Sequence, residues 1–145
     1  MKMSVQMAVT VLACSLMGCT AISVQPMDDA FAMQQVCIQE NTRVIRGDFL
    51  PVLVQGFHKH GIDTKLVRGE MPDYCEFVVT YTATQTWDLA MVLKDAEVWI
   101  HRSGLQVAYA NFHLRGGGGF SLMKWQGAEK KIMPMLDELL AEYHP

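Results

Sequence analysis

The clearest pattern in the chain is an alternation of side chains over residues 75–87. Apolar residues occupy every second position from 75 to 83, and threonines fill most of the positions between and after them. A period of two is typical of a β-strand with one buried and one exposed face, so a strand is predicted here. The face expected in the core carries Cys75, Phe77, Val79, Tyr81 and Ala83, and the other face carries Thr80, Thr82, Thr84 and Thr86.

Two further strands are predicted over residues 92–102 and 105–115. In both stretches apolar residues alternate with polar or charged ones. Ser103 and Gly104, which separate them, form a two-residue turn that requires positive φ, and such a turn is typical of a tight β-hairpin. Two shorter extended segments are predicted at 36–38 and 64–68.

Two stretches have apolar residues at the spacings of three and four that are typical of amphipathic helices. The first follows Asp48, which is expected to cap it, has Pro51 in its first turn, and ends at Gly61. In the second, Pro134 predicts either a kink or a helix that begins near Lys131. The apolar stripe of the first is Leu50, Leu53, Val54 and Phe57, and that of the second is Ile132, Met135, Leu136, Leu139, Leu140 and Tyr143.

The predicted order of elements is β-α-β-β-β-β-α. Strands joined by short turns favour antiparallel pairing, and each amphipathic helix needs a sheet surface on which to bury its stripe. The sequence therefore predicts an α+β fold. It would be a two-layer sandwich with a mainly antiparallel sheet of four to five strands and two helices on one face.

Residues 1–18 differ in character from the rest of the chain. The basic residue Lys2 precedes a mostly apolar run over 5–16. A run of about 12 residues has the length of the apolar region of a secretory signal and is too short to span a bilayer. We therefore expect a signal peptide, with an uncleaved core helix as the alternative.

The apolar run ends in the tetrapeptide Leu16-Met17-Gly18-Cys19. This tetrapeptide resembles the lipobox of bacterial lipoproteins. The resemblance implies cleavage between Gly18 and Cys19, and acyl chains such as palmitate on Cys19, which would anchor the protein firmly in a membrane. Thr20, in place of Asp, implies the periplasmic face of the outer membrane in preference to the inner membrane. An ordinary signal peptide followed by a chance cysteine is the alternative.

Residues 19–35 show no regular period, and they include Pro26 and the acidic pair Asp28 and Asp29. We expect a flexible tether after the lipidated cysteine, with a reach on the order of 20 Å from the membrane. The predicted organisation is a signal peptide at 1–18, lipidated cysteine and tether at 19–35, and a single α+β periplasmic domain at 36–145.

Four cysteines are present, of which Cys14 lies in the signal and Cys19 in the lipobox. Cys37 and Cys75 remain, and an even pair in an exported domain favours a disulfide. Closing a loop of roughly 38 residues would contribute about 4 kcal/mol of stability. A metal site is disfavoured because neither cysteine has another ligand at suitable spacing. A catalytic thiol is the remaining alternative and has no supporting motif.

The composition argues against two classes of protein. The 145 residues are 50% hydrophobic and 19% charged, which excludes a disordered regulator. The 12 Lys+Arg are outnumbered by 15 Asp+Glu, for a net charge of −3, and this disfavours binding to nucleic acid through a basic surface. We therefore expect no nucleic-acid partner and attachment to the membrane through lipid.

Four consecutive glycines precede the C-terminal helix. Backbone N–H groups before a helix can bind an anion, so these residues are a candidate ligand loop; a flexible link between strand and helix is the alternative. The spacing matches neither a P-loop nor a dinucleotide-binding motif. The candidate loop consists of Gly116, Gly117, Gly118, Gly119, Lys124 and Trp125.

Further candidates lie on the predicted sheet. His101 and His113 fall on neighbouring strands and could lie near each other, but no third ligand is in view, so no metal or other cofactor is expected. Met91, Trp99 and Tyr109 fall on the strand faces opposite the core. With the threonine row they would form an exposed surface for an envelope protein or a second copy of the chain. Cover by a loop or the tether is the alternative.

Several short motifs resemble those of a family of small proteobacterial lipoproteins. The resemblance spans about residues 36–140 and includes the lipobox. It implies the fold boundaries and an envelope location, but no activity and no catalytic residue. The motifs are Cys75-Glu76-Phe77, Thr80-Tyr81-Thr82-Ala83, Trp87-Asp88, Ala96-Glu97, Leu114-Arg115 with the four glycines, Ser121-Leu122 and Lys124-Trp125.

The sequence contains no recognisable nucleophile motif, and we do not expect an enzyme. We expect a lipid-anchored periplasmic lipoprotein that acts as a non-enzymatic binding or structural module of the cell envelope. A binder of a small ligand or envelope component through the glycine run is the second interpretation. A hydrolase is the third.

Overall fold

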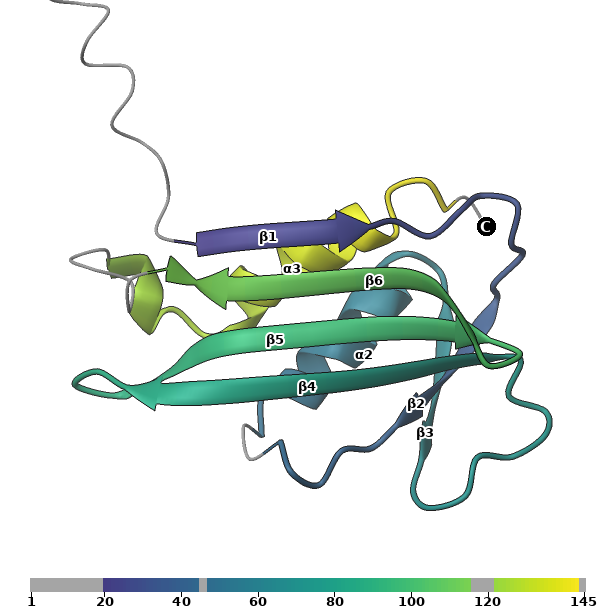
Figure 1. The fold of residues 1–145 in the computed structure, drawn as a ribbon, viewed down its shortest axis with the longest axis horizontal. Coiled ribbons are helices and arrows are strands. Elements are labelled where there is room, and N and C mark those ends of the chain that lie inside the picture. The colour runs from purple at the N-terminus through teal and green to yellow at the C-terminus, as the bar shows by residue number, and fades with distance from the viewer. Residues whose placement is uncertain (1–19, 45–46, 116–121, 144–145) are drawn as a thin grey trace, which may run out of the picture.

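The computed structural model describes residues 20–44, 47–115 and 122–143 (Figure 1). The predicted signal peptide, Cys19 and the glycine run at 116–119 lie outside the described residues. In chain order the elements are β1 (Thr20–Gln25), β2 (Gln35–Gln39), α2 (Phe49–Lys59), β3 (Asp63–Val67), β4 (Phe77–Trp87), β5 (Met91–Arg102), β6 (Leu105–Leu114), the 3₁₀ helix η3 (Leu122–Trp125) and α3 (Ala128–Leu139).

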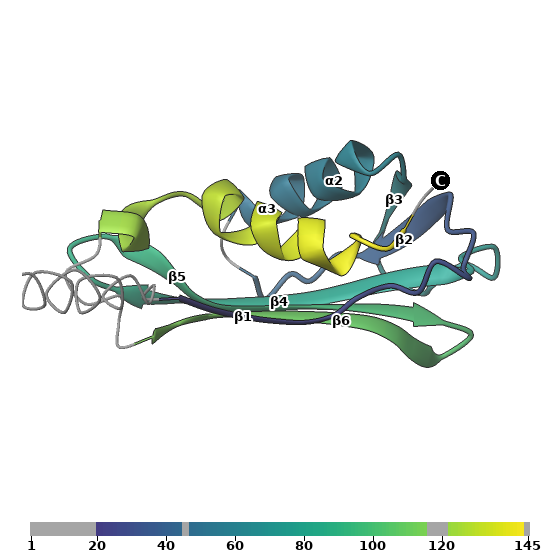
Figure 2. The same ribbon diagram turned by 90° about the horizontal axis from the view of Figure 1, so that it is seen from above.

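The strands form one mixed sheet of six strands in the order β1-β6-β5-β4-β2-β3. Strand β2 runs parallel to both β3 and β4, and the other neighbours are antiparallel. Both α2 and α3 cover the same face of the sheet, which Figure 2 shows from its edge. The predicted two-layer α+β sandwich is confirmed. The sheet has one strand more than expected because β1 joins its edge.

The hairpin between β5 and β6 forms as predicted. Ser103 has a φ of 50° and Gly104 a φ of 79°, the positive values that a tight hairpin turn requires. Along both strands the even-numbered apolar residues from 96 to 114 face the helices and are buried. Among the described residues, no helix combines the length and apolar character needed to cross a membrane.

Helix α2 connects the parallel strands β2 and β3 and packs against α3. A Cβ atom on Gly56 would lie 2.3 Å from the Cδ1 atom of Leu136, so the two helices approach closely where Gly56 has no side chain. The predicted stripe included Leu50 and Val54, which are only partly buried, because α2 turns Gly56 toward α3. The buried residues of α2 are Phe49, Val52, Leu53, Gly56 and Phe57.

Helix α3 begins at Ala128, three residues before the predicted position near Lys131, and it includes Pro134. The start is held by Asp48, whose Oδ2 atom accepts a hydrogen bond of 3.3 Å from the backbone N–H of Ala128. Asp48 therefore caps α3 and makes no side-chain capping bond with its own helix α2. In addition, the buried Lys131 ammonium donates to the Lys124 carbonyl at 2.5 Å.

The segment predicted as a flexible tether is part of the fold. Strand β1 pairs antiparallel with β6 along its whole length, and Thr20 lies opposite Leu114. Met27 and Met33, which follow β1, are fully buried. The Met27 N–H donates to the Leu139 carbonyl at 2.8 Å. The tether prediction is therefore wrong, because two core methionines and an edge strand fix this segment to the domain.

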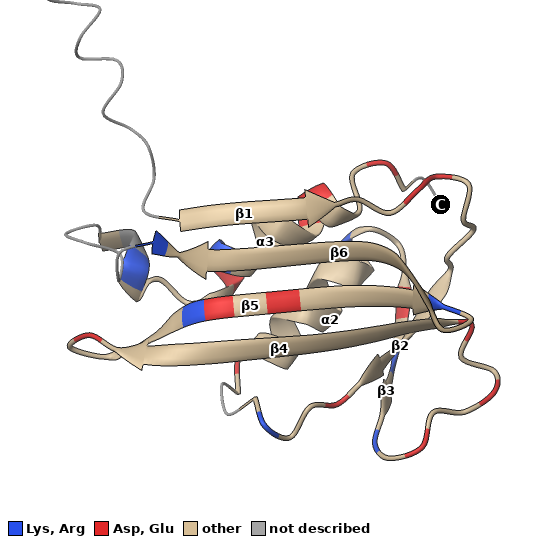
Figure 3. Ribbon diagram, viewed as in Figure 1, with Lys and Arg blue, Asp and Glu red and all other residues tan. Residues whose placement is uncertain are grey.

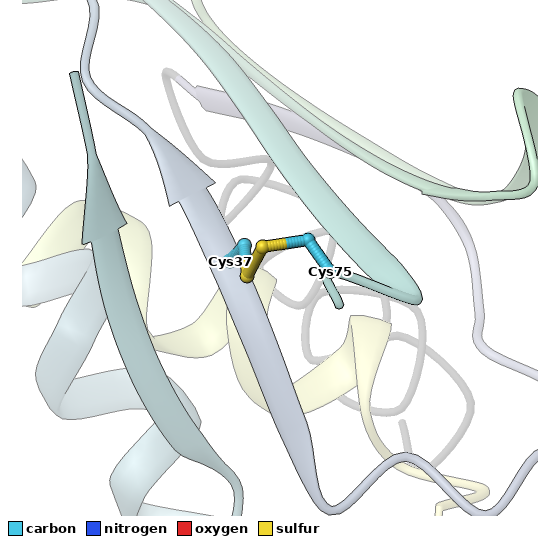
Figure 4. Close-up of a disulfide and its surroundings, with 2 residues drawn as sticks. All are labelled: Cys37 and Cys75. Carbon is cyan, nitrogen blue, oxygen red and sulfur yellow. A yellow bond between two sulfur atoms is a disulfide. The ribbon is translucent and has the colours of Figure 1, made fainter. Parts of the chain in front are cut away.

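The predicted disulfide between Cys37 and Cys75 is confirmed (Figure 4). It joins β2 to the residues just before β4, with the two Cα atoms 5.7 Å apart. The register between β2 and β4 comprises two pairs, Cys37 with Val78 and Ile38 with Val79. The disulfide therefore reinforces the shortest ladder of the sheet.

Candidate functional site

The sheet face turned away from the helices carries two aromatic side chains on neighbouring strands. Trp99 of β5 lies opposite Tyr109 of β6, with ring centroids 5.7 Å apart and ring planes tilted by 38°. Thr80 of β4 pairs with Trp99 on its other side, so the threonine row borders the two rings. Both rings are half-buried. The structure therefore brings together two of the three residues predicted for a partner surface.

Glu97 links the aromatic pair to the threonine row. The Tyr109 hydroxyl donates to one carboxylate oxygen of Glu97 at 2.7 Å, and the Thr82 hydroxyl lies 3.4 Å from the other. Burial, together with the hydrogen bond to this carboxylate, raises the pKa of Tyr109. The phenol therefore keeps its proton at neutral pH and acts as a hydrogen-bond donor within the surface.

Asp95 forms a second polar cluster on the same face. Its carboxylate accepts a hydrogen bond of 3.0 Å from the Thr84 hydroxyl and contacts the Nδ1 atom of His113. Burial opposes ionisation of Asp95, but the hydrogen bonds from His113 and Thr84, with the charge of Lys94, hold its pKa below the usual value. At neutral pH the carboxylate is ionised and paired. This arrangement suits a polar binding surface better than a proton-transfer site, which needs a pKa near the working pH.

Met91 does not share the face of this aromatic pair. Its partner in β4 is Trp87, whereas the partner of Trp99 is Thr80. These two β4 residues are an odd number of positions apart (87 − 80 = 7), so strand alternation places them on opposite faces. The prediction for Met91 is therefore wrong, because the register shift in the β4–β5 ladder passes over Lys94 and reverses the alternation.

His101 and His113 are not neighbours. His113 lies opposite Asp95 and His101 opposite Gln106, six positions apart along β5 (101 − 95 = 6), which is about 20 Å. The expectation that they could meet is wrong, because the tight turn at Ser103 pairs His101 with the start of β6. In the described part of the chain, no group of three or more His, Cys, Asp and Glu side chains is placed to hold a metal ion.

Two residues of the candidate ligand loop, Lys124 and Trp125, lie in η3 and contact the turn between β4 and β5. The Lys124 ammonium is 2.5 Å from Asp88 Oδ2 and 4.4 Å from the centroid of the Trp125 ring. The Trp125 indole N–H donates to the Asp88 carbonyl at 2.8 Å. Lys124 therefore directs its charge to Asp88. Gly116, Gly117, Gly118 and Gly119 lie outside the described residues.

Exposed apolar side chains gather where η3 meets the turn of the β4–β5 hairpin. The contacts of Asp88 hold these two elements together. We call this group the apolar tip. It comprises Trp87 (71% exposed), Leu89 (81%), Met91 (53%), Leu122 (77%) and Trp125 (39%).

The sequence pattern does not indicate the apolar tip as a site. Trp87 falls at the end of a predicted strand, and Trp125 falls in the candidate ligand loop. The signal that could have indicated the site is Leu89, an apolar residue inside a turn between two strands. Turns of this kind usually carry Gly, Asn or Asp.

The chain resembles known proteins in its fold alone. No protein-family model matches the chain, and no curated protein matches it. Among solved structures, the chain is similar to the PelC dodecamer from Paraburkholderia phytofirmans. A crystal in space group P6 aligns with a TM-score of 0.57 and 10% identity over 86% of this chain and 99% of the PelC chain. A point variant of PelC in space group C2 aligns with a TM-score of 0.57 and 9% identity over 85% and 95%.

Proposed function

We propose that this protein is a lipid-anchored lipoprotein of the cell envelope whose α+β domain is a non-enzymatic binding or structural module. The observation that carries the proposal is the tetrapeptide Leu16-Met17-Gly18-Cys19, which resembles a lipobox and directly precedes β1. The proposed location is the periplasmic face of the outer membrane. Thr20, in place of Asp, after the cysteine supports this location by the same resemblance.

The disulfide supports export to an oxidising compartment. Disulfides persist in exported proteins and are rare in a reducing cytosol. Cys37 is 2% exposed, and its bond to Cys75 reinforces a two-pair ladder. The fold therefore uses this bond as a structural element, which a cytosolic protein could not rely on.

The position of β1 supports close attachment to the membrane. Consecutive Cα atoms lie about 3.8 Å apart, so a lipid on Cys19 would be one residue from a strand of the sheet. The domain would then rest directly at the membrane surface, without the spacer that a tether would supply. A module of this kind can hold the sheet face that carries Trp99 and Tyr109, here called the sheet surface, at a fixed distance from the bilayer.

A second copy of the chain is the partner we favour for the sheet surface, and a different envelope protein is the alternative. The structures with a similar fold are dodecamers, which supports self-association of this fold. The surface around Trp99 and Tyr109 combines aromatic rings with hydrogen-bonding groups, a composition typical of interfaces. The two outer strands of the sheet, β1 and β3, also present edges that can pair with another chain.

The lipid anchor is tested with the full-length chain produced in a Gram-negative bacterium in the presence of radiolabelled palmitate. The wild-type chain is expected to carry label and to remain with washed membranes. Cys19→Ser should lose both properties, whereas Cys14→Ser, the matched control inside the signal, should keep both. Absence of label from the wild-type chain, or label that persists in Cys19→Ser, would contradict the proposal.

Self-association is tested on the same protein after extraction into detergent. Light scattering is expected to give a protein mass several times that of one chain, and Trp99→Asp should lower this mass. The control is Leu105→Asp, which changes an exposed side chain at the β5–β6 turn and should leave the mass unchanged. A single-chain mass for the wild-type protein at all concentrations would contradict self-association through the sheet surface.

A further inference from the structure

The apolar tip is an exposed apolar surface whose side chains are not part of the hydrophobic core. Its three hairpin residues, Trp87, Leu89 and Met91, are each more than half exposed, although β4 and β5 bury most of their other apolar residues. Large apolar side chains that gather in one exposed place usually mark a binding site.

Leu89 has a strained backbone conformation. Its φ is 58°, in the left-handed region that disfavours residues with a Cβ atom. Gly or Asn would relieve this strain in a turn closed by the bond from the Asp88 N–H to the Ala90 carbonyl. Neither turn geometry nor packing explains a leucine with 81% exposure at this position. A role for its apolar side chain outside the fold does explain it.

The tip is firmly held. Asp88, in the turn, accepts the Trp125 indole N–H through its carbonyl and pairs with Lys124 through its carboxylate. Lys124 is in turn 7% exposed, and its carbonyl accepts a hydrogen bond from the buried Lys131 of α3. These contacts connect the tip to the helical layer, so its side chains are presented in a defined arrangement.

The tip lies at the end of the molecule where β1 begins. Figures 1 and 2 both show the start of β1, η3 and the β4–β5 turn at the same end of the long axis. One row of the sheet joins Thr84, Asp95, His113 and Ala21. Beyond this row, Thr20 is one residue further and Trp87 three residues further, which are about 3 Å and about 10 Å along the strands.

The Trp87 end of the hairpin therefore projects roughly 7 Å further than Thr20. Apolar faces of interfacial proteins enter about 5–10 Å into the boundary between headgroups and acyl chains. A lipid attached at Cys19 would bring Thr20 to the membrane surface, and the tip would then reach this boundary. Trp is also the side chain most enriched at membrane interfaces, together with Tyr.

The charges are consistent with this orientation. Lys94 of β5 and Arg115, which directly follows β6, are exposed near the tip end, whereas the buried Lys124 is paired with Asp88 and adds no net charge there. Figure 3 shows acidic residues concentrated in the loops at the opposite end of the sheet. Basic residues near a bilayer are attracted to anionic headgroups, and acidic ones are repelled.

We propose that the apolar tip inserts into the headgroup layer of the phospholipid membrane beside the lipid on Cys19. This inference rests on the proposed lipid anchor. The lipid and the tip together give two attachment points at one end of the strands. The strands therefore run away from the membrane surface, and the Ser103–Gly104 turn lies at their far end. The sheet face with Trp99 and Tyr109 is then presented sideways, toward neighbours in the plane of the membrane.

The insertion is tested with the mature protein, isolated from membranes and reconstituted into vesicles of phosphatidylethanolamine and phosphatidylglycerol. Part of the lipid carries bromine on its acyl chains, which quenches tryptophan fluorescence at short range. Quenching is expected for the wild-type protein. Trp87→Phe should lose a large part of the quenching, with the remainder due to Trp125, the other tryptophan of the tip, whereas Trp99→Phe, the control on the sheet face, should keep it.

Leu89→Gly provides a variant whose fold should not suffer, because glycine suits the turn. It is expected to reduce quenching, and Leu105→Gly at the opposite turn should leave quenching unchanged. Equal quenching in the wild-type protein and Trp87→Phe, in a protein that carries the palmitate label, would overturn membrane insertion and leave the lipid anchor standing. Absence of the label would instead contradict the proposed function.

A second copy of the chain is the competing occupant of the tip. In that case Trp87 would be shielded from bromine, and a Leu89→Cys variant would form a disulfide-linked pair of chains in vesicles. That outcome would also overturn membrane insertion. The expected result is a Leu89→Cys thiol that remains single and reacts more slowly with a water-soluble maleimide when vesicles are present.

Discussion

Thr20 pairs with Leu114, so the residue that follows the proposed lipidation site is already part of the sheet. Leu114 is 2% exposed and belongs to the core. A membrane anchor on Cys19 would therefore be coupled to the core through one strand pairing. The segment after the anchor has a structural role that a tether does not have, and its loss should be measurable as a loss of stability.

Met27→Ala is expected to destabilise the domain by about 2–5 kcal/mol, the usual cost of removing a fully buried large apolar side chain. Met27 is 0% exposed, and its N–H donates to the last residue of α3. The control is Gln25→Ala, which changes an exposed residue of β1 and should shift stability by no more than about 0.5 kcal/mol. Urea denaturation followed by circular dichroism gives both values. Equal stability of the two variants would mean that residues 20–34 are detached from the fold in solution.

Reduction of the Cys37–Cys75 disulfide should lower the free energy of unfolding. Its loop separates the cysteines by 38 positions, for which the chain-entropy model gives about 4 kcal/mol. Denaturation with and without reductant measures the difference. The double variant Cys37→Ser with Cys75→Ser should match the reduced protein and show no response to reductant. A wild-type denaturation curve that does not change with reductant would show that the disulfide does not contribute to stability.

The antiparallel part of the sheet could be predicted because the sequence features that specify it are local. Alternation along β4, β5 and β6 sets which residues are buried, and Ser103 with Gly104 sets the turn. The pattern that defines β1 is also present, since Ile22 and Val24 alternate with polar residues. Its four alternating positions follow a signal-like run directly, so the pattern was too short to stand out.

The features that the sequence did not predict depend on contacts between distant segments. The parallel position of β2 between β3 and β4 is set by the packing of α2, and no local pattern encodes it. Met91 was placed on the wrong face because one extra residue in β5, at Lys94, changes the register. The apolar tip arises only when η3 folds back onto the β4–β5 turn, which brings Trp125 to Asp88.

Gly56→Ala is expected to destabilise the domain by about 1–3 kcal/mol because the added methyl group overpacks the helix contact. A Cβ atom there would lie 2.3 Å from Leu136 Cδ1 and 3.3 Å from its Cβ. The better helix propensity of alanine offsets this by about 1 kcal/mol at most. Gly47→Ala is the control, since no atom lies within 4 Å of a Cβ added there. Thermal unfolding should show a lower midpoint for Gly56→Ala alone.

Stability should fall in acid as Asp137 becomes protonated. Burial opposes its ionisation, but hydrogen bonds from Lys59 (2.7 Å) and His60 (2.9 Å) lower its pKa below the ordinary value. A carboxyl with a lowered native pKa stabilises the fold above its unfolded pKa of about 4, and this contribution is lost as the pH falls through the native value.

Asp137→Asn should therefore be less stable than the wild-type protein at pH 6, by no more than about 1 kcal/mol because the pair is partly exposed. The difference should shrink in acid and disappear at a pH below the lowered native pKa of Asp137, where both side chains are neutral. Asp63→Asn, which changes an exposed residue at the start of β3, is the control and should follow the wild-type protein at both pH values. A difference that stays constant with pH would assign the effect of Asp137 to packing and not to charge.

Leu89→Gly is expected to raise the free energy of unfolding by about 0.5–1 kcal/mol. A residue with a Cβ atom in the left-handed region costs about 1–2 kcal/mol, and glycine loses part of this gain through its greater freedom in the unfolded chain. Leu105→Gly, in a strand, should instead lower stability by about 0.5–1 kcal/mol. Chemical denaturation in detergent, away from any bilayer, separates this effect from membrane binding. If Leu89→Gly were less stable than the wild-type protein, Leu89 would contribute to packing of the domain, and its exposure would no longer require a partner outside the fold.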